Sequence, residues 1–386
     1  MKRFCILLVL LLVLALTVAS AHAFPFPHTD VRGQAMGGAY VAAAKGVGSV
    51  NYNPAGLARG RMFEFVAPAT LRFSDHIDID DKLTQIENIT GGSTFATWAS
   101  DTATVSQRAQ IVSLINQLNV SGENSIDLMM YTSGGVSVNV FGIAGAVSYN
   151  YEVIASMITS MDTTNVTTTD PTASDFIGGN TSTLQFRGIE DRQVVLTGAK
   201  EFGSLALGVN LRQIQATAYA TSLVLFDNTD PDIRDELTNN GVSETASAID
   251  VGLQLELAPT LRGGVVARNI NSPEFTFPGS AGTMKLEPRY RAGVALDLPI
   301  VMVVADIDLT TTESLSGAEF REIAVGGEIN LVGIQLRAGY SKNIALDSSD
   351  AIIHAGFGLG GFLDVAASAD ADMKSISGGA AISLKF

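Results

Sequence analysis

Residues 249–257 read Ile-Asp-Val-Gly-Leu-Gln-Leu-Glu-Leu, so apolar side chains alternate with polar or small ones along the whole stretch. Because successive side chains of a strand point to opposite faces, this stretch predicts a strand with one apolar and one polar face. Strands of membrane β-barrels have this pattern, with the apolar face toward lipid, but strands of soluble sandwiches alternate as well. The connections between strands have to decide between the two.

The same alternation recurs through the C-terminal half and, less regularly, before it. It predicts fourteen strands, at about 62–74, 126–140, 143–156, 183–199, 204–222, 246–257, 261–270, 287–298, 301–309, 320–331, 334–343, 351–359, 362–371 and 375–386. The joins between them alternate strictly between long and short, the short ones being 141–142, 200–203, 258–260, 299–300, 332–333 and 360–361. Short periplasmic turns and long outer loops explain this alternation, and a sandwich does not. We therefore predict an all-β fold, a transmembrane antiparallel β-barrel of about 14 strands with both termini in the periplasm.

Composition agrees with a membrane barrel. Hydrophobic residues make up 46% of the 386 residues and charged residues only 16%, yet no apolar run after Val18 approaches the ~20 residues of a membrane-spanning helix. The net charge of −15 disfavours nucleic acid as a partner, since nucleic-acid binding requires a basic surface.

The N-terminus has the organisation of a signal peptide. Lys2 and Arg3 precede an apolar run over 4–18, and Ala21-His22-Ala23 supplies a small-residue cleavage site. Residues 1–23 are therefore predicted to be a signal peptide; a single-pass anchor is the alternative, which the short apolar run disfavours. The only cysteine, Cys5, lies in this segment, so the mature chain is expected to have no disulfide and no thiolate site.

The C-terminus ends on an alternating apolar pattern, at Ile382, Leu384 and Phe386. Barrel-assembly machinery commonly reads such an ending with a terminal aromatic residue. The expected partners are therefore this machinery and the lipid of the Gram-negative outer membrane, which is the predicted location.

A Gly- and Ala-rich segment precedes the first strand. It contains Met36-Gly37-Gly38-Ala39-Tyr40 and, further on, Asn53-Pro54-Ala55-Gly56. Small residues permit close backbone packing, Pro54 fixes its φ angle and Asn53 can form a side-chain turn. We predict a compact plug, or hatch, over 24–61 inside the lumen of a barrel over 62–386. A tail that merely precedes the first strand is the alternative.

These two motifs resemble the hatch of the FadL-like superfamily of outer-membrane proteins, in which the Asn-Pro-Ala element is a family hallmark. Two stretches are more similar to the PorV/PorQ and TraF-like branch of this superfamily. They are the Met-Gly-Gly-Ala motif and residues 285–293, which read Lys-Leu-Glu-Pro-Arg-Tyr-Arg-Ala-Gly. The resemblance implies a fourteen-strand barrel with an N-terminal hatch, whose fold Asn53, Pro54 and Ala55 would hold. It also implies passive passage of hydrophobic small molecules.

The strand phases point many charges toward the lumen. These are Arg212, Asp250, Glu256, Arg262, Arg268, Arg289, Arg291, Asp297, Asp306, Asp308, Glu328, Arg337, Asp364 and Asp370. Because buried charges must be paired or hydrated, we predict a salt-bridged wall around the hatch. An apolar conduit would then have to be built near the outer rim by the loops and the upper hatch.

The longest loop, about 74–125, is predicted to carry a small helical lid. Its apolar residues at helical spacing are Val105, Ala109, Val112, Ile115 and Leu118. They either pack on the barrel rim, which we favour, or line a capture site. Four aspartates at the start of the loop do not match the spacing of an EF-hand, and no metal site is predicted.

Catalytic motifs are missing from the sequence. His28, His76 and His354 are the only histidines after the signal peptide, and no Gly-x-Ser-x-Gly, His-Glu-x-x-His or phosphate-binding loop occurs. His354 has no serine partner that the sequence identifies, so we predict neither an enzyme nor a cofactor. Two functions remain. Transport of hydrophobic small molecules is favoured; the alternative is a non-transporting, PorV-like barrel that anchors or partners a secretion or surface-attachment system.

Overall fold

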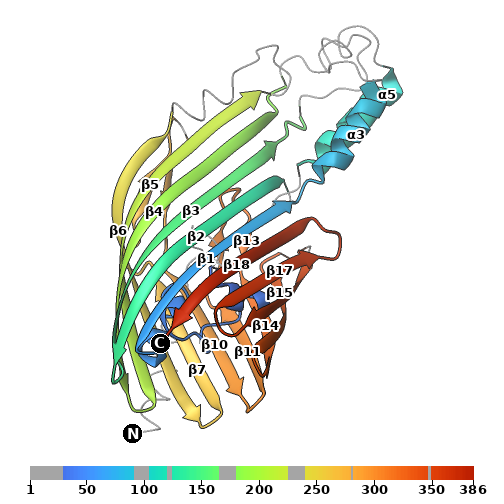
Figure 1. Cartoon of the computed structure of the whole chain (residues 1–386). Helices are drawn as coiled ribbons and strands as arrows, with labels where there is room; N and C mark the ends of the chain where they lie inside the picture. Colours follow the sequence, from blue (N-terminus) through green and yellow to red (C-terminus); the bar gives the residue numbers. More distant parts are fainter. Residues whose placement is uncertain are drawn as a thin grey trace.

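The computed structural model describes residues 29–90, 104–119, 124–164, 180–224, 240–279, 281–346 and 349–386; the predicted signal peptide lies outside these residues. Fourteen antiparallel strands form one closed barrel (Figure 1). They are β1 (Phe63–Asp75), β2 (Ser125–Val140), β3 (Ile143–Ser160), β4 (Thr183–Phe202), β5 (Leu205–Val224), β6 (Val242–Ala258), β7 (Leu261–Arg268), β10 (Arg289–Asp297), β11 (Val301–Asp308), β14 (Glu322–Leu331), β15 (Ile334–Asn343), β16 (Ala351–Leu359), β17 (Leu363–Asp370) and β18 (Ser375–Lys385). The predicted fold class is confirmed.

Barrel strands that follow one another along the chain are neighbours in the barrel, and β1 closes the ring by pairing with β18. The closing register runs from Glu64 opposite Lys385 to Ser74 opposite Ser375. The turns that the sequence predicted to be short gather at one end of the barrel, together with the C-terminus (Figure 1). We call this the short-turn end and the opposite one the long-loop end.

The barrel wall has two heights. Strands β7, β10, β11 and β14–β17 have 8 to 10 residues, which matches a single crossing of a bilayer, about 9–11 residues. Strands β2–β6 have 16 to 20 residues and extend beyond the others at the long-loop end (Figure 1). We call β2–β6 the tall wall.

The polarity of the tall wall inverts along its strands. Near the short-turn end of β5 the outward side chains, Leu207, Val209 and Leu211, are apolar, and beyond them Gln213 and Gln215 are exposed. On the inner face the order is opposite, since a buried Arg212 precedes Ile214, Ala216 and Ala218. In β6, outward Ile249 and Val251 likewise give way to Ser247 and Thr245. The part of the tall wall near the short-turn end therefore has an apolar outer face that suits lipid. The part near the long-loop end has a polar outer face and an apolar inner face.

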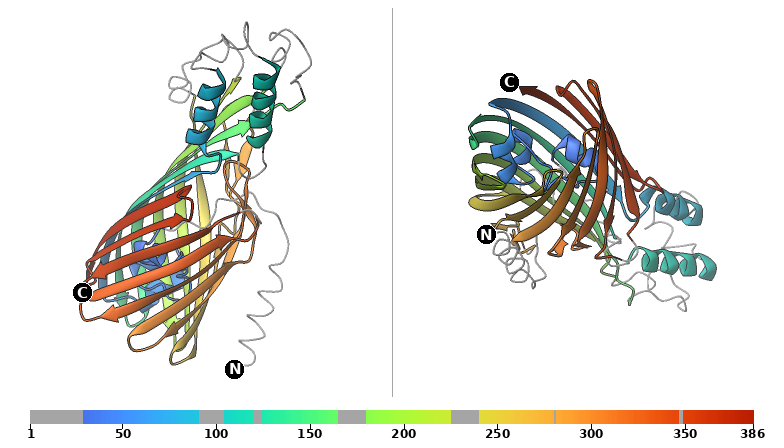
Figure 2. Two further views of the ribbon diagram at one scale, coloured as in Figure 1. Left: turned by 90° about the vertical axis from the view of Figure 1, so that its right-hand side faces the viewer. Right: turned by 90° about the horizontal axis from the view of Figure 1, so that it is seen from below.

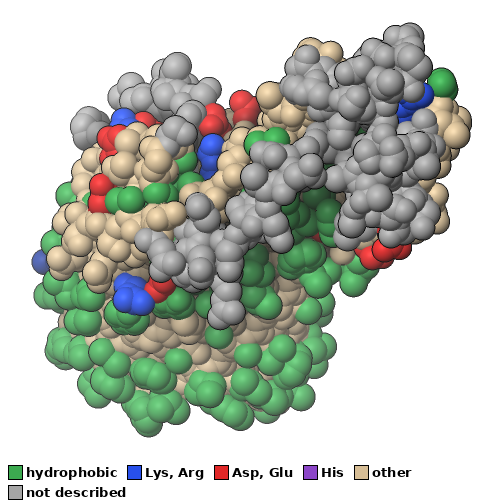
Figure 3. Space-filling view, turned by 90° about the horizontal axis from the view of Figure 1, so that it is seen from above, with side chains coloured by type: hydrophobic (Ala, Val, Ile, Leu, Met, Phe, Trp, Pro, Cys, Tyr) green, Lys and Arg blue, Asp and Glu red, His purple; other side chains and the backbone are tan. Residues whose placement is uncertain are grey.

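The hydrophobic side chains on the outside form the lipid-facing surface. Figure 3, which looks onto the long-loop end, shows them gathered on the outer surface of the barrel. Among the described residues no helix is long and apolar enough to cross a membrane.

Residues 29–61 lie inside the barrel and form three short helices: α2 (Val31–Ala35), η1 (Val47–Ser49) and η2 (Pro54–Arg59). Figure 2 shows them in the lumen toward the short-turn end. The Asp30 side chain caps α2 by accepting the backbone N–H groups of Arg32 and Gly33. Helix α2 contacts β15–β18 and η2 contacts β3–β6, so the hatch touches both halves of the barrel.

Two helices of the longest loop, α3 (Ile79–Thr90) and α5 (Val105–Gln117), lie side by side at the long-loop end (Figures 1 and 2). Helix α5 matches the predicted lid helix. Of its predicted apolar stripe Ile115 is buried, Val112 and Leu118 are half-buried, and Val105 and Ala109 are exposed. The buried residues are Arg108, Ile111, Leu114 and Ile115, while Val105 is 63% exposed. Thr104 caps the helix, which leaves Val105 at its exposed first position, and Gln107 donates to the Ile89 carbonyl of α3.

Two loops of the shorter strands fold inward as hairpins that the sequence did not predict. The loop after β7 forms β8 (Glu274–Thr276) with β9 (Thr283–Lys285), and the loop after β11 forms β12 (Thr312–Glu313) with β13 (Glu319–Phe320). Phe275 of the first hairpin and Leu315 of the second are buried in the same apolar cluster as Ile214 of the tall wall. The hairpins therefore cover the inner face of the tall wall.

Candidate functional site

Side chains of the wall satisfy the backbone of the hatch, which is largely irregular and needs such partners. One carboxylate oxygen of Asp306 accepts the N–H groups of Tyr40, at 2.8 Å, and Val41, at 2.9 Å. Gln254 donates to the carbonyls of Val41 and Ala44, both at 3.0 Å. The wall thus provides hydrogen bonds that regular secondary structure would otherwise supply.

The predicted hatch motif lies where these contacts converge. Asn53 is fully buried; its Oδ1 accepts the N–H of Ala55 at 3.1 Å, and its Nδ2 donates to the carbonyls of Val41, at 3.1 Å, and Leu253 of β6, at 3.0 Å. Pro54 begins η2, where its fixed φ suits the first helical position. The order Asn-Pro-Ala therefore has a structural reason. Asn53 caps η2 and binds the wall, Pro54 starts the helix, and Ala55 donates the capped N–H.

Glycines complete the motif. Gly37 and Gly38 have φ angles of 76° and 85°, which favour glycine. A Cβ at Gly56 would collide with the Ala44 carbonyl oxygen. Facing them, seven wall glycines approach the hatch so closely that a Cβ at any of them would press on it: Gly208, Gly252, Gly264, Gly326, Gly339, Gly356 and Gly379. We call these seven the glycine belt. It leaves little space between the hatch and the wall.

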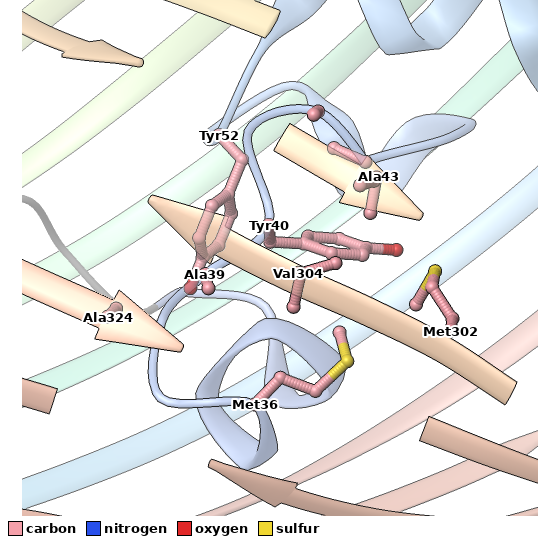
Figure 4. Packing of buried hydrophobic residues seen from close by; sticks show 11 residues of the cluster. Met36, Ala39, Tyr40, Ala43, Tyr52, Met302, Val304 and Ala324 are labelled. Carbon is pink, nitrogen blue, oxygen red and sulfur yellow. The ribbon is translucent and has the colours of Figure 1, made fainter. Parts of the chain in front are cut away.

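Apolar contacts reinforce the seal. Met36, Tyr40 and Tyr52 of the hatch pack with Met302 and Val304 of β11, and Figure 4 shows these side chains converging. The rings of Tyr40 and Tyr52 meet edge to face, with centroids 5.4 Å apart and an angle of 84°. Burial raises the pKa of both phenols and keeps them neutral.

The predicted lumen charges form buried ion pairs around the hatch. On one side Arg291 Nε lies 2.6 Å from Asp308 and its Nη2 3.1 Å from Glu322. Next to it Arg337 lies 2.7 Å from Glu328 and 2.6 Å from Asp364. Glu328 also binds Arg32 of α2 at 2.7 Å, and this ion pair joins the hatch to the wall.

A second group of charges, above the hatch, we call the charged layer: Arg212, Asp250, Arg268 and Arg289, all buried. Arg212 lies 3.0 Å from Asp250, and Arg268 donates to the carbonyl of Asn51 in the hatch at 3.3 Å. Arg289 stands directly opposite Arg268 on the neighbouring strand. The layer separates the hatch from the upper lumen.

Four further predicted charges, Arg262, Asp297, Glu256 and Asp370, lie away from these networks. Arg262 is 3.0 Å from Asp297, and Glu256 is 3.0 Å from Arg59 of η2; both carboxylates are partly exposed at the short-turn end. Asp370 accepts the N–H groups of Lys374 and Ser375 near the long-loop end. Sequence phasing placed all these residues on the inner face, but it did not predict their partners.

Above the charged layer lies an apolar region, which we call the outer chamber. Buried apolar side chains pack together there: Ile154, Ile189, Ile214, Ala216, Ala218 and Ala248 of the tall wall with Phe275, Phe277, Leu286 and Leu315 of the inward loops. From the sequence, the loops and the upper hatch were expected to build such a region; the loops contribute, but the tall wall replaces the hatch. The available signal was the inversion of alternation after Arg212, where inward positions become apolar.

A cavity of about 310 Å³ adjoins the chamber at the long-loop end. Its apolar lining includes Met129, Ile154, Leu315, Phe320, Leu346 and Ile352. Arg72, Asp127, Ser341 and Asn343 add polar groups. The lining is therefore mixed: apolar side chains form part of it, and polar or charged residues are the larger number.

Of the three histidines considered above, His76 and His354 lie among the described residues. His354 is buried, and its Nε2 lies 3.0 Å from the hydroxyl of Ser341, a partner one strand away that the sequence did not reveal. His76 is 3.8 Å from Asp127, and His28 lies outside the described residues. In the part of the chain that the structure describes, no three His, Cys, Asp or Glu residues are grouped to hold a metal.

The C-terminal residues of the predicted assembly signal face outward at the short-turn end. Ile382, Leu384 and Phe386 are exposed along β18, and the Phe386 ring lies 6.2 Å from the ring of Phe63. Their role in assembly remains a prediction.

Solved structures share this fold. CymD, described as a monoaromatic hydrocarbon channel, aligns with a TM-score of 0.57 at 10% identity over 94% of this chain and 99% of its own. The toluene transporter TbuX of Ralstonia pickettii aligns with a TM-score of 0.55 at 11% identity, over 92% of this chain and 97% of its own. The toluene transporter TodX of Pseudomonas putida aligns with a TM-score of 0.50 at 10% identity, over 95% and 100%.

No curated protein matches the sequence. A family profile described as "F plasmid transfer operon, TraF, protein" matches residues 50–308, which is more than half of the chain. This match covers the end of the hatch, the tall wall and the strands up to β11. The barrel has the fold of these solved structures, and the chain belongs to this TraF protein family.

Proposed function

We propose that this protein is an outer-membrane barrel that captures hydrophobic small molecules in its outer chamber and passes them on without an energy source. The observation that carries the proposal is the inverted polarity of the tall wall, which puts an apolar inner face above the level of lipid contact. A soluble sheet hides such a face under a full core; here two short hairpins cover it and a cavity remains. The structurally similar proteins are described as channels or transporters of monoaromatic hydrocarbons and toluene.

The dimensions suit small ligands. A cavity of about 310 Å³ is at the small end of ligand pockets, which are usually ~300–1,000 Å³. Burial of an apolar ring surface of some 100 Å² would contribute about 2–3 kcal/mol, at ~25 cal/mol per Å². Modest affinity of this kind suits capture followed by release.

A matched pair of substitutions on β2 tests the cavity of the outer chamber. Met129→Trp enlarges a side chain that lines the cavity, and Met130→Trp adds the same ring to the outer face at the adjacent position. We expect Met129→Trp to weaken equilibrium binding of toluene by about tenfold or more, because the ligand and the new ring need the same space. Met130→Trp should bind as the parent does. If both variants bind toluene like the parent, this cavity is not the site.

The alternative is a barrel that does not transport and instead anchors a partner protein, with both termini in the periplasm. The glycine belt and the buried ion pairs support it, since passage along the lumen requires the hatch to move. Extraction in mild detergent, followed by mass spectrometry of retained molecules, separates the two functions. An enriched apolar ligand supports transport, whereas a retained partner protein and no ligand would favour the anchor.

A further inference from the structure

The mouth of the lumen at the short-turn end contains a second cavity, of about 210 Å³, between the hatch and the wall. Arg32 and Lys45 of the hatch line it, together with Arg262 of β7 and the turn that joins β10 to β11. Unlike the outer chamber, this cavity is dominated by charged side chains. It lies at the opposite end of the barrel from that chamber, so a role for it is independent of the proposed function.

Two cations in this cavity share one carboxylate, whereas Arg32 pairs with Glu328, which also lines the cavity. Lys45 Nζ and Arg262 Nη2 approach the same oxygen, Asp297 Oδ2, at 3.8 Å and 3.0 Å. The Arg262 side chain is only 9% exposed, and its Nε has no hydrogen-bond partner among the described residues. One carboxylate thus serves two cations, and a buried guanidinium donor remains unsatisfied, which is costly.

The electrostatics of Lys45 agree with this excess of positive charge. Burial lowers the pKa of its ammonium group, and the neighbouring Arg262 guanidinium lowers it further. An anion between the two cations would remove this repulsion and supply acceptors to both. Guanidinium and ammonium groups together are the usual ligands of phosphate oxygens.

The surroundings are those of a membrane boundary. The turn beside the cavity exposes Leu298 and Ile300, at 43% and 59%, and both are apolar. It is short, so little separates the cavity from the lipid-facing surface. Basic pockets at such levels bind lipid headgroups.

We propose that the mouth of the lumen is an oxyanion site in which Lys45 of the hatch and Arg262 of the wall hold one phosphate group. The phosphate comes from a lipid headgroup or from solution. In either case the phosphate links Lys45 of the hatch to Arg262 of β7, at the point where both cations approach the carboxylate of Asp297.

Variants of the full-length barrel, purified in detergent, test this site. Phosphatidylglycerol retention is measured by native mass spectrometry, and inorganic phosphate is titrated against chloride at constant ionic strength while thermal unfolding is followed. We expect Lys45→Gln and Arg262→Gln each to weaken binding by about tenfold, the loss of one charge-assisted hydrogen bond. Asp297→Asn should strengthen binding, because it removes the competing carboxylate.

The control is Lys200→Gln. Lys200 lies at the same end of the barrel but is exposed on the outer face, where its Nζ is 4.8 Å from the Phe202 ring. We expect it to bind like the parent. Loss of retained lipid with no effect of free phosphate identifies a headgroup site; stabilisation by free phosphate identifies a soluble anion. Lys45→Gln and Arg262→Gln binding as well as the parent, or Asp297→Asn binding more weakly, would overturn the proposal.

Discussion

Single residues of the hatch and wall depend on one another at close range. Gly264 of β7 illustrates this, because a Cβ there would lie 2.8 Å from the Val41 carbonyl oxygen and 2.9 Å from the Ala42 Cα. Its neighbour Gly263 points outward, where a Cβ would meet only the Leu257 side chain at an ordinary 3.5 Å. The two glycines are adjacent in sequence but face different environments.

This difference leads to a prediction. Gly264→Ala should destabilise the folded barrel by about 1–3 kcal/mol, because the hatch backbone must shift to make room. Gly263→Ala should be neutral or slightly stabilising, since it only reduces the freedom of the unfolded chain. Urea unfolding of barrels refolded in lipid vesicles measures both. Equal effects of the two substitutions would mean that the hatch yields easily.

Buried arginines lead to a second prediction at the residue scale. Removal of the Arg291 side chain would leave Asp308 and Glu322 as buried charges without their cation, which typically costs about 3–5 kcal/mol. Arg192 is the control, since its side chain is 54% exposed and pairs with Glu190 on the surface, where such pairs contribute about 0–1 kcal/mol. We expect Arg291→Ala to lower the free energy of unfolding strongly and Arg192→Ala to change it little. Similar small losses would show that the lumen is well hydrated.

Prediction from sequence has a clear limit at this scale. The alternation of each strand predicts which side chains face inward. It assigned charges such as Arg291 and Glu328 to the inner face, and both are buried. Their partners depend on the register between neighbouring strands, as for Arg291 and Asp308, and on contacts with the hatch, as for Glu328 and Arg32. The alternation within one strand shows neither. Asn53 shows the same limit: the motif predicted a turn, but the tie to Leu253 required the structure.

At the scale of elements, long strands were predictable and short ones were not. Strands with several apolar-polar repeats, such as β6 and β14, can be recognised from the alternation in their own sequence. The hairpin strands β8 and β12 have three and two residues, too few for a period to be detected. Helix α5 was predicted as an element, yet its buried face was misjudged, since packing beside α3 is not visible in its own sequence.

The inverted polarity of β5 predicts where the membrane ends. In a Cys5→Ser background, which removes the only native cysteine, Gln213→Cys and Val209→Cys place a thiol on the outer face four residues apart. We expect a membrane-impermeant maleimide added to intact cells to label Gln213→Cys and to spare Val209→Cys, because lipid shields the latter. Labelling of urea-unfolded protein controls for reactivity. Equal labelling of both positions on cells would contradict the assigned boundary.

For the whole molecule, closure and strand number followed from simple regularities. An even count of strands and alternating join lengths predict an up-and-down barrel without any knowledge of side-chain contacts. The predicted strand lengths show that the two halves of the barrel differ in height, but they do not show that this difference creates an outer chamber. Only the combination of height with inverted polarity identifies an outer chamber, and that combination becomes visible when all strands are aligned on one membrane level.

The closure of the ring also sets an order of events in time. The hatch precedes the barrel along the chain and is synthesised before it, yet α2 rests on β15–β18, and β1 pairs with β18, the last of the fourteen barrel strands. Loop-closure entropy grows slowly, by about 0.6 kcal/mol per doubling of length, so this wait adds little to the equilibrium cost. It matters for kinetics: until β15–β18 are made, α2 lacks its contacts with them, and until β18 is made the sheet has two open edges. A nascent chain that stops short of β15 therefore exposes both defects together, and chaperones and proteases have a long interval in which to find them.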